Sequence, residues 1–69
     1  MYNIGYYNKP WSKSDFVILA QTKSNGVAHF IMDSYNVAYK RNGMSANAIV
    51  LRDDQLPEDH RFSKDCLED

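Results

Sequence analysis

Two apolar, β-prone runs flank the tetrapeptide Lys23-Ser24-Asn25-Gly26 in the stretch DFVILAQTKSNGVAHFIMD. Asn-Gly supplies the positive φ that a tight hairpin turn requires. We therefore expect strands near 15–22 and 27–32, joined as a hairpin. In the second run both alternating sets of side chains are largely apolar, so the sequence predicts that 27–32 is a central strand.

The following segment, DSYNVAYKRNG, has two interpretations. Capping side chains at its start, Lys40 and Arg41 near its end, and Gly43 after them favour a short helix over about 34–42. The alternation of apolar and polar residues through 37–41 fits a third strand instead. We favour the helix, because its start and stop signals agree with the helical period.

Three further elements complete the expected fold. The continuous apolar run AIVL indicates a strand near 46–52 that is covered on both faces. The stretch YNIGYYN suits an edge strand before Pro10, and Pro57 suits the first turn of a C-terminal helical turn. The sequence thus predicts an α+β fold: a small antiparallel sheet of three to four strands with one short helix. An all-β meander is the alternative.

The size of the chain limits how stable it can be on its own. It has 69 residues and a single cysteine, Cys66, which cannot form an intramolecular disulfide. A core of this size usually supplies only about 3–5 kcal/mol. We therefore expect one domain that is helped by a partner or by homo-oligomerisation.

Charge divides the chain into two parts. Residues 1–52 carry six basic and two acidic side chains, whereas residues 53–69 carry two basic and seven acidic ones. We treat 1–52 as the body and 53–69 as an acidic C-terminal segment, either part of the same domain or frayed. It could serve as a solubilising end, pack on the body through Phe62 and Leu67, or occupy a basic groove on a nucleic-acid-handling protein.

The sequence lacks the motifs of the common catalytic classes. Its three glycines are isolated, so no phosphate-binding loop is present, and Gly-x-Ser-x-Gly is absent. Cys66 lies too near the end to hold a nucleophile's geometry with a histidine, and no pair of ligands has the spacing of a metal site. We expect no enzyme activity, no catalytic residues, no metal and no cofactor.

The remaining hypotheses concern binding. The aromatic cluster near the N-terminus is too large for its short, polar surroundings to bury, and tyrosine and tryptophan anchor interfaces. The expected partner-binding residues are Tyr6, Tyr7, Trp11, Asp53, Asp54, Glu58 and Asp59. They predict a small non-catalytic protein that occupies a surface of a larger protein partner, such as a phage or mobile-element accessory inhibitor of a host enzyme.

The alternative function is a nucleic-acid-binding module that uses the basic, aromatic body. Dispersed cations and a pI near 6.0 disfavour it. The N-terminus has no signal-peptide pattern, and the longest apolar run, FVILA, is far shorter than the ~20 residues that span a bilayer. We therefore expect a cytoplasmic protein without membrane insertion.

Overall fold

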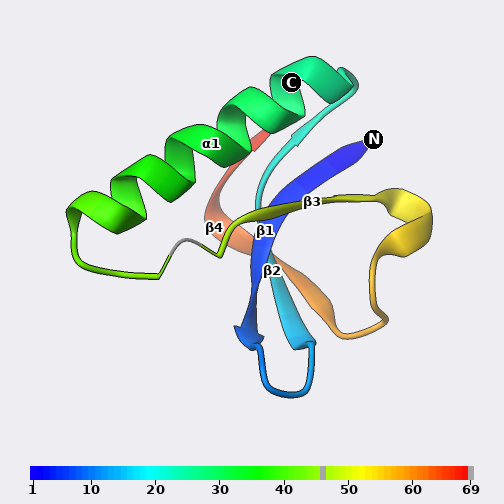
Figure 1. Ribbon diagram of the computed structural model, residues 1–69. Coiled ribbons are helices and arrows are strands. Elements are labelled where there is room, and N and C mark those ends of the chain that lie inside the picture. Colours follow the sequence, from blue (N-terminus) through cyan, green and yellow to red (C-terminus); the bar gives the residue numbers. More distant parts are fainter. Residues whose placement is uncertain (46, 69) are drawn as a thin grey trace.

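The computed structural model describes residues 1–45 and 47–68. Four strands, one long helix and one 3-10 turn follow one another along the chain (Figure 1). Their bounds are β1 Tyr2–Lys9, β2 Ser14–Thr22, α1 Asn25–Arg41, β3 Ile49–Arg52, η1 Asp53–Gln55 and β4 His60–Glu68.

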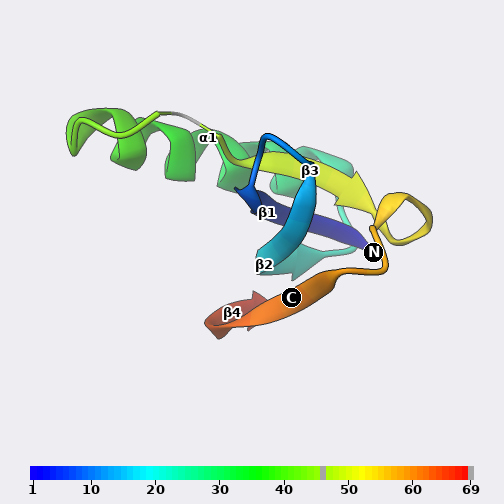
Figure 2. The same cartoon turned by 90° about the horizontal axis from the view of Figure 1, so that it is seen from below.

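The four strands form one mixed sheet in the order β3-β1-β2-β4. β1 is antiparallel to both β2 and β3, whereas β4 is parallel to β2. β2 and β3 therefore run in the same direction on either side of β1, and α1 connects them. Figure 2 shows α1 as a layer on one side of the sheet, with β4 at the edge away from β3. The α+β fold with a four-stranded sheet and one helix is confirmed, but the sheet is mixed where an antiparallel one was expected, because β4 pairs in parallel with β2.

The tight hairpin lies between β1 and β2, at residues 10–13, and not at Asn25-Gly26. β1 was expected at an edge but is central, with β2 on one side and β3 on the other. β3 was expected to be covered on both faces but is an edge strand of four residues.

The predicted strand 27–32 is wrong, because these residues belong to α1. The Ser24 hydroxyl caps the helix by accepting from the backbone N–H of Val27 at 3.3 Å. Gly26 is not among the residues with positive φ, so Asn25-Gly26 forms the first turn of a helix and no hairpin. Apolar side chains on both alternating sets also fit a helix, because Ala28 and Met32 are four residues apart and both contact the core.

The expected helix over 34–42 is confirmed from residue 34 to Arg41, although α1 begins at Asn25, nine residues before the predicted start at 34. Lys40 and Arg41 occupy its last turn. Gly43 then adopts φ 73°, and the N–H of Met44 donates to the carbonyl of Tyr39 at 2.8 Å. This left-handed residue ends the helix as expected.

Small buried side chains join α1 to the sheet. Ile4 of β1, Ala20 of β2 and Ala28 of α1 are fully buried against one another. On the opposite face of the sheet, Phe16 and Ile18 are also fully buried. Both faces of the two central strands therefore contribute to the core.

The C-terminal helical turn is wrong, because residues 60–68 form β4. Phe16 to Ile18 pair with His60 to Phe62, and pairing resumes at Leu67 after an irregularity. Phe62 is 52% exposed and Leu67 is 62% exposed, so neither is the buried anchor that was expected. The β4 part of the acidic segment is held instead by strand pairing with β2.

Candidate protein-binding surface

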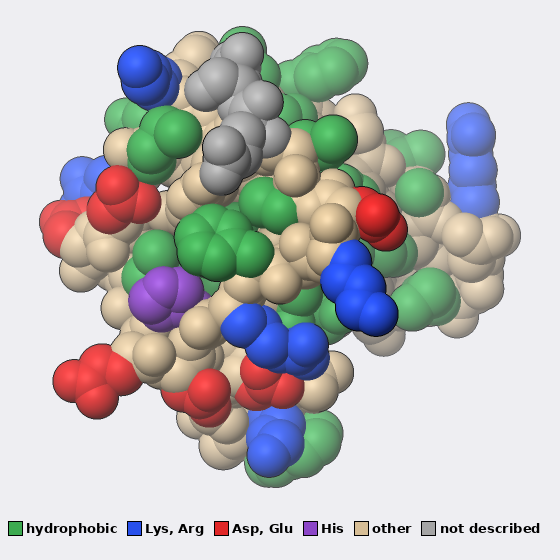
Figure 3. All heavy atoms as spheres, turned by 180° about the vertical axis from the view of Figure 1, so that it is seen from behind, with side chains coloured by type: hydrophobic (Ala, Val, Ile, Leu, Met, Phe, Trp, Pro, Cys, Tyr) green, Lys and Arg blue, Asp and Glu red, His purple; other side chains and the backbone are tan. Residues whose placement is uncertain are grey.

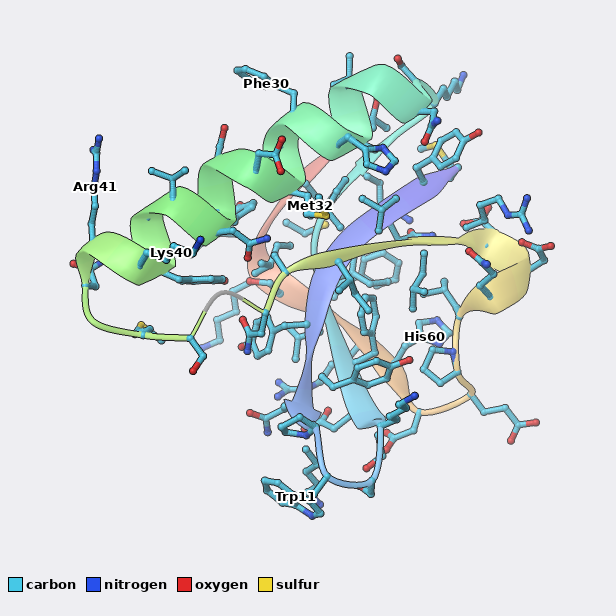
Figure 4. All side chains as sticks on the ribbon, viewed as in Figure 1. Trp11, Phe30, Met32, Lys40, Arg41 and His60 are labelled. Carbon is cyan, nitrogen blue, oxygen red and sulfur yellow. The ribbon has the colours of Figure 1, made fainter. Side chains whose placement is uncertain are left out.

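Trp11 lies at the tip of the β1–β2 hairpin. Its side chain is 81% exposed and extends beyond the ends of the strands (Figure 4). Large exposed aromatic side chains at the tip of a projecting element are typical anchors of protein interfaces. Of the aromatic residues singled out in the sequence, Trp11 is the one that remains almost fully accessible.

Backbone hydrogen bonds fix the tip that presents Trp11. The N–H of Ser12 donates to the carbonyl of Lys9 at 3.2 Å, and the N–H of Lys13 donates to that of Pro10 at 3.3 Å. The hydroxyls of Ser12 and Ser14 are 2.6 Å apart. An anchor on an ordered turn loses less conformational entropy on binding than one on a flexible loop.

A polar cluster clamps the base of the hairpin. Arg61 of β4 donates to the Asp15 carboxylate at 2.9 Å, and Asn8 of β1 donates to its other oxygen at 2.8 Å. Asp59 accepts from the N–H of Asp15 through its side chain and from the N–H of Phe16 through its carbonyl, both at 3.0 Å. The hairpin is thereby joined to the start of β4.

The clamp changes the electrostatics of the hairpin. The hydrogen bond from Arg61, and then that from Asn8, holds the pKa of Asp15 below its usual value. Arg61 neutralises Asp15, and Lys9 and Lys13 are the exposed charged residues that flank Trp11 along the chain, whereas the acidic Asp59 lies at the base of the hairpin. The tip thus combines an apolar anchor with a positive flank.

The hydrogen bonds to Asp15 predict how the stability of the fold depends on pH. The pKa of Asp15 is lower in the folded chain than in the unfolded one, so its contribution is present above about pH 4 and is lost as the pH falls through the folded pKa. We expect Asp15→Asn to flatten the acid side of a melting-temperature profile between about pH 2 and 5. Asparagine also tolerates the φ of 56° at this position.

Asp33→Asn, on the exposed surface of α1, is the matched control and should keep the wild-type profile. If the melting temperature of the Asp15 variant depends on acidic pH as that of the wild type does, the stabilising role of the hydrogen bonds to Asp15 is wrong. Thermal unfolding followed by circular dichroism at each pH makes the measurement.

Tyr6 and Tyr7 are half-buried, so they are only partly available to a partner. The ring of Tyr7 contacts that of Phe16 edge to face, with centroids 5.2 Å apart. Tyr6 lines a small hollow together with Leu19 and Tyr39. Both tyrosines therefore support the fold as well as its surface.

Asp53 and Asp54 lie at the other end of β1 from Trp11. Asn3, which is fully buried, donates to Asp53 at 2.9 Å, and this bond is the main reason that the pKa of Asp53 is lowered. Asp54 pairs with Arg52 at 3.3 Å. Because β1 spans eight residues, its ends are roughly 25 Å apart, so these acids do not share a site with Trp11.

Glu58 and Asp59 precede β4 at the hairpin end of the molecule. Asp59 belongs to the clamp at the base of the hairpin. Glu58 is exposed, and within the described residues its side chain makes no hydrogen bond or ion pair. The structure therefore brings Glu58 and Asp59, but not Asp53 and Asp54, to the end that presents Trp11.

Neither sign of charge is concentrated on the face opposite the view of Figure 1. Figure 3 shows Lys and Arg side chains there interspersed with Asp, Glu and hydrophobic ones. Among the described residues no group of three His, Cys, Asp or Glu side chains could hold a metal ion. Nor is any described helix long and apolar enough to cross a membrane.

The sequence interpretation missed an exposed apolar face on α1. Phe30 is 73% exposed and Val37 is 50% exposed. Their separation of seven residues places them on one helix face, but this signal was hidden because 27–32 was assigned to a strand.

No protein-family model, curated protein or solved structure matches this chain.

Proposed function

We propose that this chain is a small non-catalytic binding protein that occupies a surface of a larger protein partner with its β1–β2 hairpin. The observation that carries the proposal is the 81% exposure of Trp11 on a hydrogen-bonded turn. Exposing a tryptophan to water gains nothing for folding, whereas burying it at an interface removes a large apolar surface from water.

The flanking charges indicate what the partner surface offers. Lys9 and Lys13 lie on either side of Trp11 along the chain, and both are exposed. A complementary site is an apolar pocket with acidic groups at its rim, since rim charges steer association and set orientation. Glu58 lies at the same end of the molecule and is a further candidate contact at the edge of the interface.

This mode of action needs no chemistry from the chain. A protein that covers a functional surface inhibits by exclusion, which is how a cytoplasmic phage or mobile-element accessory inhibitor of a host enzyme would act. The division of the acidic residues between two ends weakens the idea that they jointly imitate a nucleic-acid backbone. Hairpin insertion is therefore the better-supported mode.

Nucleic-acid binding is the less favoured alternative. Trp11 with Lys9 and Lys13 could stack on a base and contact two phosphates. The other exposed cations of the body are dispersed, with Lys23 before α1 and Arg41 at its end. Few simultaneous phosphate contacts mean weak binding at physiological salt.

Replacing Trp11 with alanine should abolish most partner binding and leave the fold intact. We expect affinity to fall by at least about thirtyfold, which corresponds to about 2 kcal/mol for an interface anchor. The melting temperature should stay close to that of the wild type, because the side chain is largely exposed. Affinity capture from the source cell identifies the partner, and titration calorimetry with that partner measures the loss.

Val27→Ala is the matched control, because Val27 is also an exposed apolar residue but lies in the first turn of α1, which follows the end of β2 away from the hairpin. It should bind as the wild type does. Equal affinity of the Trp11 variant and the wild type would refute the proposed mode. If the captured material is lost after nuclease treatment, the nucleic-acid alternative is favoured.

A further inference from the structure

An apolar stripe runs along the outer face of α1. It consists of Val27, Phe30 and Val37, which are exposed large hydrophobic residues, with Ser34 between them. The spacings of three, four and three residues place all four on one face of the helix. Phe30 points away from the sheet in Figure 4, opposite to Met32, which contacts the core.

An open groove lies beside the stripe, between α1 and the end of β4. It has a volume of about 360 Å³ and is lined by Phe30, Ile31, Ser34, Tyr35, Ala38 and Leu67. Among the lining residues Ala38 has a small side chain, and Phe30 and Leu67 are largely exposed. A projecting ring and a groove that could receive such a ring thus lie next to each other.

We propose that a second copy of this chain covers this surface, as a two-fold symmetric dimer with the two α1 helices packed antiparallel. A knob and a groove on one surface are self-complementary, as a two-fold interface requires. With the axis at Ser34, residues equally far before and after it face each other. Phe30 of each copy then faces Ala38 of the other copy and enters its groove.

Ser34 is suited to the centre of this interface. Its side chain is small, so the two helices can approach closely. Its hydroxyl donates to the carbonyl of Phe30 on the preceding turn at 3.0 Å. The hydroxyl therefore keeps a hydrogen-bond partner when water is excluded, and burial leaves no polar group unsatisfied.

Charge selects the antiparallel orientation. Asp33 is the only acidic residue of α1, and Lys40 and Arg41 occupy its last turn (Figure 4). Parallel packing would bring the cations of the two copies together. Antiparallel packing separates them and places each pair beside the first half of the other helix, which carries no Lys or Arg.

The size of the surface sets the strength of the dimer. α1 has 17 residues and is about 25 Å long. Its stripe and groove form a patch on the order of a few hundred Å². Two such patches together bury less than the about 1,200–2,000 Å² of a standard specific interface, so we expect a weak dimer whose dissociation constant lies above about 10 μM. The dimer is independent of what the hairpin binds.

Sedimentation equilibrium of the full chain across a dilution series tests the proposal. The wild type should change from dimer to monomer, and Phe30→Ser should raise the dissociation constant by at least about tenfold. Trp11→Ser removes an equally exposed ring outside the surface and should leave the constant unchanged. If the wild type stays monomeric across the series, the proposal is overturned. This holds also where another protein fills the groove of the monomer. The proposal is also overturned if Trp11→Ser dissociates the dimer and Phe30→Ser does not.

A cysteine at the axis provides a second, positive test. In a Cys66→Ser background, Ser34→Cys should form a covalent dimer under mild oxidation, because a disulfide needs Cα atoms about 4.4–6.8 Å apart. Lys23→Cys in the same background is an exposed control away from the axis. Cross-linking of the Ser34 variant no faster than that of the control overturns the two-fold at Ser34.

Discussion

Replacing Gly5 with alanine is expected to cost about 3 kcal/mol or more, most of the stability that a chain of this size possesses. Gly5 lies on β1, where the register with β2 shifts between Ile4 and Gly5. A Cβ there would overlap the carbonyl oxygen of Val17 and lie 2.9 Å from its carbonyl carbon. The backbone of a central strand cannot move away without breaking its pairing, so the strain persists.

The other two glycines serve as graded controls. At Gly26 a Cβ would meet only the Ser24 hydroxyl at 3.9 Å, so Gly26→Ala should be neutral or slightly stabilising. At Gly43 nothing is within 4 Å, but φ is 73°, so Gly43→Ala should cost about 1 kcal/mol. Urea unfolding followed by circular dichroism ranks the three. If the Gly5 variant is as stable as the Gly26 variant, the close approach of β2 at the register shift is wrong.

The sequence interpretation located the apolar segments better than it assigned them to helix or strand. Residues 27–32 are apolar on both alternating sets, which describes a buried strand and a helix equally well. The Ser24 cap and the continuous period through Tyr39 would have favoured the helix, but Asn25-Gly26 was given more weight. Asn25-Gly26 instead forms the start of a helix that begins at Asn25 and continues to Arg41.

Strand order was not accessible from local patterns. β1 looks like an edge strand because Asn3 and three tyrosines interrupt its apolar character. In the fold Asn3 is fully buried, where it donates to the Leu51 carbonyl and to Asp53 and accepts from Gln21 at 2.7 Å. A polar residue can occupy a central strand when all its hydrogen bonds are made, and these partners are 18 to 50 residues away.

The candidate site was predictable in part. Trp11 could be singled out because a tryptophan between Pro10 and two serines has few neighbours along the chain to bury it. The separation of Asp53 and Asp54 from Glu58 and Asp59 could not, because η1 and the connection to β4 place the two pairs at different ends of the sheet. Composition shows that charge is unevenly divided along the chain. It does not show which acidic side chains already pair with other groups of the fold.

Removing residues 60–69 is expected to abolish cooperative folding. The deletion removes β4, so β2 loses the hydrogen bonds of its outer edge and Asp15 loses Arg61. Phe16 and Ile18, which are fully buried and pair with His60 and Phe62, would then be exposed to water. Burying a large apolar side chain is worth about 1.5–3 kcal/mol, so losing cover from both costs about 3–6 kcal/mol, as much as the whole stability of a core this small.

A charge variant separates this packing from the acidity of the segment. Asp54→Asn combined with Glu58→Gln removes two negative charges, and both residues are exposed. Because the interactions of exposed charges contribute little, unfolding of this variant should match that of the wild type within about 1 kcal/mol. The truncated chain should instead give a broad unfolding curve without a baseline in calorimetry and circular dichroism. A sharp, wild-type transition after truncation would show that 60–69 is dispensable, as a solubilising end would be.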